Sequence, residues 1–434
     1  MTQRVVVVGG DAAGMSAAHQ ALRAAKLRDR SIEVLAFEAT DRTSYSACGI
    51  PYWIGEEVGS GDDLVARSAD AHREAGIDLR MGTPVTAVDV AAHTVTAGGE
   101  DFEYDDLVFA TGAQPIIPDW ALVDGTLPDH VGPVHTLADG ARWLDQLDDR
   151  SRPVTILGAG YIGLEMAEAA LRRGHQVTLK SQGRVMSTFA RELSERVEGG
   201  LRDAGATVET GVTMTSIEND DPLILAIGLE PRTSLLEGQV SLSERGALRP
   251  DRHGQVQEHL WSAGDCCEVW HRVLDDWAYL PLGTHANKQG RALGDALGSG
   301  GDSGLHFDGA LGTAITRFTV GDVDLEISTT GLTRTQAPDS AASLLTEGST
   351  ASGYFPGAAP LAIHVTADPS SRRLLGVQIV GGPGAGKRID AAAACLWMGA
   401  TVDELAWMDL SYAPPFATAW EVLQVAARRL AERL

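Results

Sequence analysis

The sequence has few cysteines, and none of them has a partner at the spacing of a redox pair or a metal site. Cysteine occurs four times in 434 residues, as Cys48, Cys266, Cys267 and Cys395. Zinc sites and dithiol redox pairs use spacings such as C-x-x-C and C-x-x-x-x-C, which are missing here. The sequence therefore predicts no metal site and no internal disulfide at Cys48.

Basic residues and long apolar runs are scarce as well. Lys and Arg number 35 against 59 Asp and Glu, a formal charge of -24, which argues against nucleic acid and anionic membranes as partners. No apolar run approaches the roughly 20 residues of a membrane span, and no signal-peptide pattern precedes the apolar run at 5–8. We expect a soluble, cytoplasmic protein of two to four domains.

What the sequence does contain is an internal repeat. The two copies begin RVVVVGGDAAGMSAAHQALR and PVTILGAGYIGLEMAEAALRRG, each an apolar strand, a glycine-rich turn and an alanine-rich helix. Both continue into a second strand, at 32–37 and 176–179, and both later reach a strand that ends in glycine, at 107–112 and 223–228. The repeat predicts an α/β protein with two Rossmann-like nucleotide-binding domains.

The glycine-rich turns indicate dinucleotide binding, because glycine lets the backbone approach a pyrophosphate at a helix N-terminus. The second copy fits GxGxxG with Gly158, Gly160 and Gly163, whereas the first has Gly9 and Gly14 with Asp11 in the middle position. Either turn alone could be purely structural, but two matches in the same frame favour two nucleotides.

The ends of the second strands indicate which nucleotides bind. Glu38 closes the first unit and suits the ribose hydroxyls of FAD or NAD. The second unit has no acid there but has Lys180 and Arg184, which favours the 2′-phosphate of NADPH over NADH. If both cations are ordinary solvated charges, the preference stays open.

Ten segments together resemble the FAD-dependent pyridine nucleotide-disulfide oxidoreductases, in particular the single-cysteine branch of coenzyme A-disulfide reductases and NAD(P)H oxidases. They are GGDAAGMSAA, SYSACGIPYWIG, ATGAQPIIP, GAGYIGLEMAE, AIGLEPRT, SAGDCCEVWHRV, YLPLGTHANKQGRALG, YFPGA, KRIDAAAA and DLSYAPPF. The resemblance implies an FAD domain at 1–117 and 245–306, an NAD(P) domain at 118–244, and an α+β dimerisation domain at 307–434. It also implies a homodimer with active sites shared between subunits.

The resemblance implies a set of cofactor-binding residues. Asp265 would accept hydrogen bonds from the FAD ribityl chain, with a simple turn former as the alternative, and Tyr161 would cover the nicotinamide pocket. The FAD residues are Gly9, Gly10, Asp11, Ala13, Gly14, Glu38, Ser44, Val85, Thr111, Gly112, Asp265 and Ala286; those for NADPH or NADH are Gly158, Gly160, Tyr161, Ile162, Gly163, Lys180, Arg184 and Gly228.

Cys48 is the expected reactive thiol, and a helix start beside it is expected to lower its pKa. Without a second cysteine, its oxidised form must be a mixed disulfide, a sulfenic acid or a persulfide. The segment Gly49-Ile50-Pro51-Tyr52 resembles the reductases more than the oxidases, whereas Ala47 stands where several reductases carry Asn. The identity of the thiol substrate therefore stays open. Cys266 and Cys267 are expected to be small core residues near the flavin.

The resemblance also supplies candidate residues for the thiol site. Tyr412 and Tyr354 would serve it from the other subunit, Tyr412 as proton donor, unless they only pack at the dimer interface. A coenzyme A-like substrate would contact Ser16, Gln20, Arg23, Ser44, Asn287 and Trp420. The first three lie on an amphipathic helix, so a solvated helix face is the alternative for them.

One departure is visible when the two copies are compared. Between its glycines the first copy has room for a strand meander at 82–112, whereas the second has only 211–228. We expect a shortened NAD(P) domain. The favoured function is reduction of coenzyme A disulfide or a related small disulfide. The alternatives are an NAD(P)H oxidase, a persulfide reductase or another acceptor reductase, and then a non-catalytic redox-responsive flavoprotein.

Overall fold

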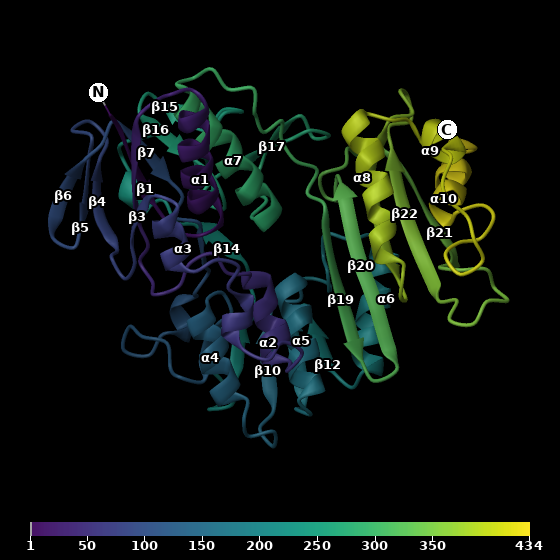
Figure 1. The fold of residues 1–434 in the computed structure, drawn as a ribbon. Coiled ribbons are helices and arrows are strands. Elements are labelled where there is room, and N and C mark those ends of the chain that lie inside the picture. Colours follow the sequence, from purple (N-terminus) through teal and green to yellow (C-terminus); the bar gives the residue numbers. More distant parts are fainter. Residues whose placement is uncertain (1) are drawn as a thin grey trace.

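The computed structural model describes residues 2–434, which form three α/β parts arranged around a central opening (Figure 1). The predicted α/β class with two Rossmann-like sheets is confirmed. The central strands β1, β7, β10 and β13 are short and mostly apolar, as expected for parallel strands buried on both faces. The predicted domain boundaries remain predictions, but the sheets fall within them.

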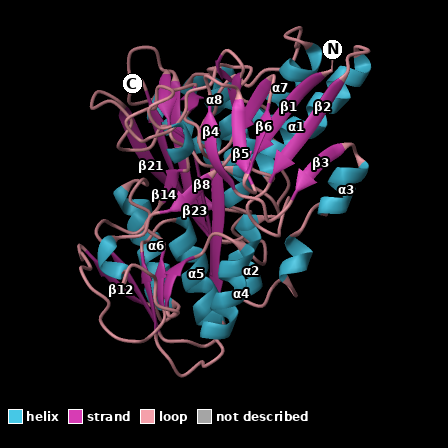
Figure 2. Cartoon of the chain, turned by 90° about the vertical axis from the view of Figure 1, so that its left-hand side faces the viewer, coloured by secondary structure: helices cyan, strands magenta, loops and turns pink. Residues whose placement is uncertain are grey.

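The first part contains a six-stranded sheet of order β15-β16-β7-β1-β2-β3, parallel except for β15. A separate three-stranded meander, β4-β5-β6, follows β3 in the chain, and α3 lies at the edge of the sheet beside β3 (Figure 2). The strands are β1 Gln3–Val8, β2 Ile32–Phe37, β3 Ile77–Arg80, β4 Val85–Asp89, β5 Thr94–Ala97, β6 Glu100–Glu103, β7 Asp106–Phe109, β15 Gln255–Gln257 and β16 Leu260–Ser262; the helices are α1 Ala12–Leu27, α3 Ala69–Glu74 and α7 Gly283–Ser299.

Helices α1 and α7 pack unusually closely. Gly290, Gly294 and Gly298 are spaced one helical turn apart on α7, and a Cβ at each would lie 2.2 to 2.3 Å from a backbone oxygen of α1. Glycine is the only residue that allows this approach. The packing brings the N-termini of both helices to the same end of the sheet.

The second part contains a five-stranded parallel sheet of order β12-β11-β10-β13-β9. Between β12 and β13 no strand forms at 211–222, whereas the first part has the β4-β5-β6 meander. A small β8-β14 ribbon connects the two parts. The bounds are β9 Val131–Pro133, β10 Val154–Leu157, β11 Val177–Ser181, β12 Thr207–Thr210, β13 Leu223–Leu225, β8 Ala113–Pro115, β14 Leu229–Pro231, α4 Leu137–Gln146, α5 Tyr161–Arg172 and α6 Arg191–Asp203.

The segment that carries Cys48 packs into this second part, although it lies early in the chain. Cys48 sits in a 3₁₀ turn, Ala47–Gly49, that leads into α2, Ile50–Ile54. Ile50 and Ile54 are fully buried in the core that contains Trp143 and Leu164, and α2 lies beside α4 and α5 (Figure 1). The thiol is thus anchored to the nicotinamide-side core.

The third part is an antiparallel five-stranded sheet of order β19-β20-β23-β22-β21. Helices α5 and α6 of the second part contact one face through β19, β20 and β23, while α8 and α10 contact β20 to β23 from within the same part. The bounds are β19 Ala314–Val320, β20 Val323–Gly331, β21 Ala342–Ser349, β22 Pro360–Ala367, β23 Leu374–Gly381, α8 Ile389–Met398, α9 Val402–Trp407 and α10 Val422–Ala431. A separate two-stranded ribbon, β17 Val269–His271 and β18 Asp276–Ala278, precedes α7 in the chain.

Candidate active site

The first glycine-rich turn forms a tight cradle at the start of α1. Gly9 has φ +108°, and a Cβ there would lie 2.1 Å from the Ala110 carbonyl oxygen; at Gly14 a Cβ would lie 1.9 Å from the Gly9 oxygen. Glu38 follows β2 and accepts hydrogen bonds from the backbone N–H of Gly10 at 2.9 Å and of Thr40 at 2.8 Å. This fixes a carboxylate where a ribose would bind.

Two buried carboxyl groups lie at the same end of the sheet and fit a hydroxyl-rich ligand. Burial raises the pKa of Asp11 to about 6, with a further rise from Glu38. Burial likewise raises the pKa of Asp265 to about 6, with Asp11 contributing. Asp11 Oδ1 is buried, and no hydrogen-bond partner for it is found among residues 2–434. Because such an acceptor needs a donor, the site fits FAD, whose ribityl and ribose groups carry hydroxyls.

The remaining predicted FAD residues border this region or follow its strands. Ala13 is buried against Gly264, and Ala286 is buried in the first turn of α7. Thr111 and Gly112 follow β7, where Gly112 has φ +71°. Val85 begins β4 and is half-buried.

The second glycine-rich turn has the same backbone geometry as the first but has Gly160 where the first has Asp11. A Cβ at Gly158 would lie 2.1 Å from the Ala226 oxygen, and one at Gly163 would lie 2.0 Å from the Gly158 oxygen. A Cβ added at Gly160 would have no neighbouring atom within 4 Å, so the outer side of the turn is open to a ligand. The turn fits a nicotinamide dinucleotide pyrophosphate. Ile162 is half-buried in the first turn of α5, and Gly228 has φ +117° just before β14.

The structure separates the two cations predicted for NADPH. Lys180 pairs with Leu157 across β10 and β11 in the way Phe37 pairs with Val8 across β1 and β2, so Ser181 is the counterpart of Glu38. Lys180 donates to Glu218 at 2.8 Å, and Glu209 lies 3.9 Å away. Its charge is therefore already compensated.

Arg184 lies three residues beyond the end of β11. It is exposed, and no ion pair is found for it anywhere between residues 2 and 434. The structure thus leaves Arg184 as the accessible cation of the predicted pair.

Cys48 is at the surface of the protomer, and its thiol is free. Protein nevertheless surrounds much of the thiol, and this partial burial raises the pKa of Cys48, with further rises from Glu165 and Asp265. The expectation that the adjacent helix start lowers the pKa of Cys48 is therefore wrong. The reason is first that burial disfavours the thiolate, and then that Glu165 and Asp265 add negative charge nearby.

A buried polar cluster beside Cys48 had not been predicted as such. The Thr316 hydroxyl of β19 donates to Glu165 Oε1 of α5 at 2.8 Å, and burial raises the pKa of Glu165. The Tyr161 hydroxyl is buried without a partner, and burial together with Glu165 raises its pKa. Burial and Glu165 also raise the pKa of Tyr52 to about 12. The signal in the sequence was Glu165 itself, an acid on the apolar helix GYIGLEMAE.

A second unpredicted feature is a hydrogen-bonded chain that ends on Ser44. Arg67 lies 2.7 Å from His19 Nε2, which lies 2.8 Å from His72 Nδ1, and His72 Nε2 lies 2.9 Å from Ser44 Oγ. Burial lowers the pKa of His72 to about 4, so the ring is neutral at neutral pH. Arginine can only donate, so His72 donates from Nδ1 and accepts the Ser44 proton at Nε2. Ser44 therefore presents lone pairs to a ligand.

The predicted substrate residues of α1 are partly occupied within the protomer. Ser16 donates to Asn287 at 3.0 Å, which brings two of the predicted residues together. Gln20 donates to Asp295 at 2.9 Å, whereas Arg23 is exposed. The first pair thus forms one polar patch between α1 and α7.

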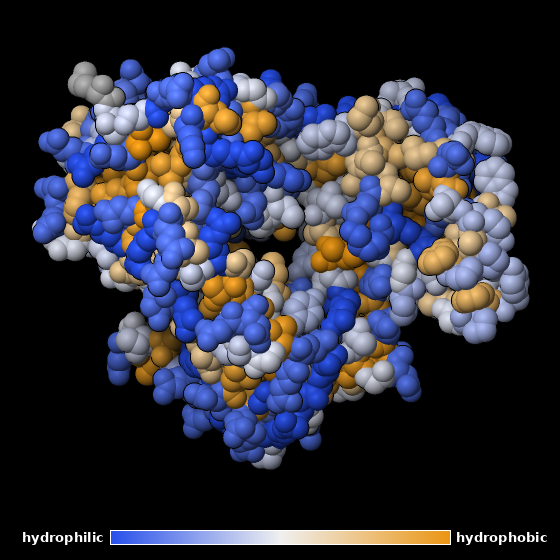
Figure 3. Space-filling view, in the orientation of Figure 1, coloured by the Kyte–Doolittle hydropathy of each residue, from blue (hydrophilic) through white to orange (hydrophobic). Residues whose placement is uncertain are grey.

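Tyr354, Tyr412 and Trp420 lie in loops of the third part that adjoin β21, α9 and α10, whereas Cys48 leads into α2, which packs in the second part. Tyr354 is 76% exposed and Tyr412 is 51% exposed. Apolar residues are visible over this C-terminal part in Figure 3. The exposed large side chains there include Tyr354, Trp397, Met398, Trp407, Tyr412, Phe416 and Trp420. Such a surface is typical of a protein interface.

The cysteines of the SAGDCC segment are both buried, as expected of core residues. Cys266 and Cys267 contact Ser262 and belong to an apolar core. Between residues 2 and 434 there is no cluster of side chains suited to a metal ion. None of the helices described is long and apolar enough to cross a membrane.

Comparison with known proteins places this geometry in a family. The family model "Pyridine nucleotide-disulphide oxidoreductase" matches residues 3–290, and the model of its dimerisation domain matches residues 318–423. A NAD(P)H coenzyme A polysulfide/persulfide reductase of Pyrococcus horikoshii is 34% identical over 99% of both chains.

Two solved structures share the whole fold. Reduced CoADR-RHD of Bacillus anthracis has a TM-score of 0.89 at 27% identity, covering 100% of this chain and 80% of that one. A water-forming NADH oxidase of Lactobacillus brevis, bound to NADH, has a TM-score of 0.91 at 28% identity and covers 100% of this chain and 99% of that one. The chain belongs to the pyridine nucleotide-disulphide oxidoreductases, a family of FAD-dependent enzymes that use NADH or NADPH.

Proposed function

We propose that the protein uses NADPH, or NADH, to reduce coenzyme A disulfide or a related small disulfide through FAD and Cys48. One observation carries this proposal: Cys48 is an open thiol beside the flavin-side carboxylate Asp265. Cys266 and Cys267, which share the FAD-side core, are buried. The sulfur that pairs with Cys48 must then come from a substrate.

The chemistry balances with one thiol. The Cys48 thiolate attacks a substrate R–S–S–R, forms a Cys48–S–S–R mixed disulfide and releases one thiol, which takes up a proton. Cleavage of the mixed disulfide then consumes two electrons and a proton and releases the second thiol. Over both steps, the hydride of NAD(P)H supplies two electrons and one proton, and solvent supplies the other proton. FAD, when bound, supplies the two-electron relay between nicotinamide and thiol.

Different residues of the chain bind the two cofactors and the substrate. The turns at 9–14 and 158–163 hold the two pyrophosphates, and Glu38, Asp11 and Asp265 accept hydrogen bonds from the hydroxyls of FAD. Ser44, held as an acceptor by His72, orients an N–H donor of the thiol substrate, which the amides of a coenzyme A arm provide. Because the Ser44 oxygen is an acceptor, it favours a thiol substrate that carries amide N–H groups.

We place the residues missing from the protomer's thiol site on a second copy of the chain. Tyr412 and Tyr354 are exposed on the dimerisation domain, where they are available to a second copy. In a homodimer, Tyr412 would protonate the leaving thiol and Trp420 would contact the substrate. We also infer a cytoplasmic location, since a reduced active-site thiol requires a reducing compartment.

Reduction of a coenzyme A-linked persulfide is the second candidate. It is favoured by the Pyrococcus horikoshii relative, named a coenzyme A polysulfide/persulfide reductase. NADH oxidases are also among the relatives, at 25 to 28% identity. All three reactions use the same flavin and thiol and differ in the acceptor.

Mass spectrometry of the isolated protein tests the proposal directly. We expect an adduct of coenzyme A mass on the peptide that contains Cys48, released by a reductant. In steady-state assays, Cys48→Ser should lower NADPH-dependent disulfide reduction by at least about 1000-fold, while NADPH still reduces the flavin. Cys395→Ser, which removes a buried thiol of the third part, is the control.

The acceptors should rank with coenzyme A disulfide above glutathione disulfide, persulfide and oxygen. Rapid oxygen uptake by both the parent protein and Cys48→Ser, without a disulfide rate, would contradict the proposal. Persulfide turnover above disulfide turnover would instead select the second candidate.

A further inference from the structure

A carboxyl group without a cation lies beside the reactive thiol. Glu165 is half-buried on α5, and in the described chain its one side-chain donor is the Thr316 hydroxyl of β19, with no ion pair. The segment that carries Cys48 packs on the same helix, because a Cβ added at Gly55, directly after α2, would lie 3.3 Å from Cα of Ala169. Glu165 therefore lies where the Cys48 segment, the nicotinamide part and the dimerisation domain meet.

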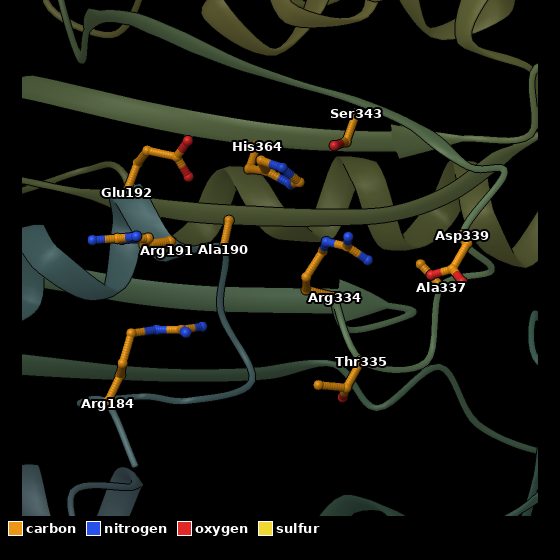
Figure 4. A pocket seen from close by; sticks show the side chains of 10 residues that line it. All are labelled: Arg184, Ala190, Arg191, Glu192, Arg334, Thr335, Ala337, Asp339, Ser343 and His364. Carbon is orange, nitrogen blue, oxygen red and sulfur yellow. The ribbon is translucent and has the colours of Figure 1, made fainter. Parts of the chain in front are cut away.

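A second acid of the nicotinamide part shows the usual arrangement for comparison. Glu192 lines a cavity of about 610 Å³ at the start of α6. It shares this cavity with the guanidinium groups of Arg184, Arg191 and Arg334 (Figure 4). The negative charge of Glu192 thus has cations near it. The charge of Glu165 has none, so a proton is the remaining way to neutralise it when a second negative charge forms nearby.

The groups that face Glu165 come from three elements. On α5 the Tyr161 hydroxyl, one turn earlier, is buried without a partner in the part of the chain that is described. From the other side, the Cys48 thiol and the Tyr52 hydroxyl both have their pKa raised by burial and then by Glu165. From β19, the hydrogen bond of Thr316 lowers the pKa of Glu165, whereas burial raises it by more. These neighbours are hydroxyls and a thiol, and none of them brings a positive charge.

The same face of α5 continues toward solvent. Glu168 is buried one turn after Glu165, and burial raises its pKa to about 7. Arg172 and Arg317 each lie 3.8 Å from Glu168 Oε1, and both also pair with Glu57 at the surface. The polar side chains of this face connect Glu165 with solvent, which gives a proton a way in.

The reactive form of Cys48 places a second negative charge next to this carboxyl group. A cysteine attacks a disulfide only as the thiolate, and Asp265 adds a further negative charge on the flavin side. Two like charges in a partly buried site without a cation are unfavourable, and two groups that interact strongly take up and lose protons as a pair. A thiolate at Cys48 therefore favours the protonated form of Glu165.

We propose that Glu165 takes up a proton when Cys48 becomes a thiolate and gives it up when Cys48 forms a mixed disulfide. Reductive cleavage of Cys48–S–S–R uses two electrons: R–SH leaves with the proton of the hydride, Cys48–S⁻ remains, and Glu165 gains a proton from solvent. Attack on the next disulfide moves the negative charge to the departing R–S⁻, which is protonated, and Glu165 returns its own proton. The overall stoichiometry is unchanged. The inference rests on the proposed role of Cys48, and Glu165 acts only through the charge of that thiol.

Alkylation of Cys48 by iodoacetamide, followed against pH in the holoenzyme with its thiols reduced, tests the coupling. Glu165→Gln keeps an oxygen that accepts from Thr316 and removes the charge. Near pH 7 its alkylation should be about 10-fold faster than in the parent protein, the factor for a difference of one in pKa, and the two rates should meet at the alkaline plateau. Glu192→Gln, the matched control, should follow the parent protein throughout.

Equal pH profiles for Glu165→Gln and the parent protein would overturn the proposal, as would a Cys48 that is not alkylated at any pH. The measurement needs neither NADPH nor a disulfide. A protein that does not reduce coenzyme A disulfide would therefore refute the proposed function and leave this result readable.

Thr316→Val tests the same coupling from the dimerisation domain. Loss of its hydrogen bond raises the pKa of Glu165, so the carboxyl group is neutral more often, and Cys48 should react faster near pH 7, by less than in Glu165→Gln. Added to Glu165→Gln, the Thr316→Val change should have no further effect. An equal effect in both backgrounds would contradict the proposal, because Thr316 would then act without Glu165.

Infrared difference spectra detect the proton itself. The holoenzyme with reduced Cys48, minus the form in which methyl methanethiosulfonate has put a methylthio group on Cys48, should show the C=O stretch of a protonated carboxyl group at pH 7. The band should be missing from the same difference for Glu165→Gln and present for Glu192→Gln. A parent protein without the band would overturn the proposal.

Discussion

The two halves of the repeat bind their nucleotides with the same backbone and different charges. In both, a strand, a turn with positive-φ glycine and a helix create a cradle that a single Cβ would fill. The first half surrounds this cradle with carboxyl groups at Asp11 and Glu38, while the second has Gly160 and Ser181 at the same positions. We therefore expect the backbone geometry to suit a pyrophosphate in both halves, and the side chains at these two positions to distinguish the nucleotides.

Alanine at the first glycine of each turn should have the largest effects. Gly158→Ala places a Cβ 2.1 Å from the Ala226 oxygen at φ +113°, so NAD(P)H-dependent flavin reduction should fall at least about 1000-fold while FAD stays bound. Gly9→Ala should instead give protein without FAD. Absorbance spectra and stopped-flow reduction separate the two losses. Gly199→Ala on α6, with open space around it, should change neither.

Gly160→Asp should convert the second turn into a copy of the first at its middle position. The Cβ has open space, so the protein should fold, but the carboxylate would face a pyrophosphate. We expect NAD(P)H to bind about 100-fold more weakly, measured by flavin reduction at increasing cofactor concentration. Gly160→Asn controls for size. Unchanged affinity in Gly160→Asp would show that the pyrophosphate lies elsewhere.

Ser181→Glu should give the second half the counterpart of Glu38. A carboxylate there accepts from ribose hydroxyls and repels a 2′-phosphate, so the preference for NADPH over NADH should shift about 10-fold toward NADH. The ratio of kcat/KM for the two cofactors measures it. Ser181→Gln, of similar size without charge, should shift the ratio less. A gain in NADPH affinity would place the ribose at another strand.

Asp11→Asn concerns the stability of the apoprotein and not the cofactor preference. The pKa of Asp11 is raised from 3.8 to about 6 in the folded chain, so its contribution to apoprotein stability is full below pH 3.8 and is lost as the pH rises through 6. At pH 7 the variant should be more stable by at most about 3 kcal/mol, in urea unfolding of the apoprotein. Asp220→Asn, at an exposed site in the other half, is the control. A benefit of equal size at pH 4 would contradict this account.

The sequence was sufficient to predict what short-range patterns encode. The repeat, both glycine-rich turns and the short segment 211–228 follow from the order of apolar and glycine residues, and the family follows from ten segments spread along the chain. Contacts between residues far apart in the chain could not be predicted from the sequence. Lys180 meets Glu218 from an irregular segment, and Glu165 meets Thr316 from another sheet. The pKa of Cys48 was misjudged because its direction depends on burial of the thiol and, after that, on carboxyl groups that folding brings close.

The packing of α2 has a consequence for how the molecule opens. Ile50 and Ile54 are buried in the nicotinamide-side core, so the backbone amides around Cys48 should be protected from hydrogen exchange together with those of α5, not with those of β1 and α1. Local opening of that core would release the reactive thiol while the flavin cradle stays folded. If a bound nicotinamide cofactor stabilises that core, alkylation of Cys48 should become slower even though the cofactor does not contact the thiol.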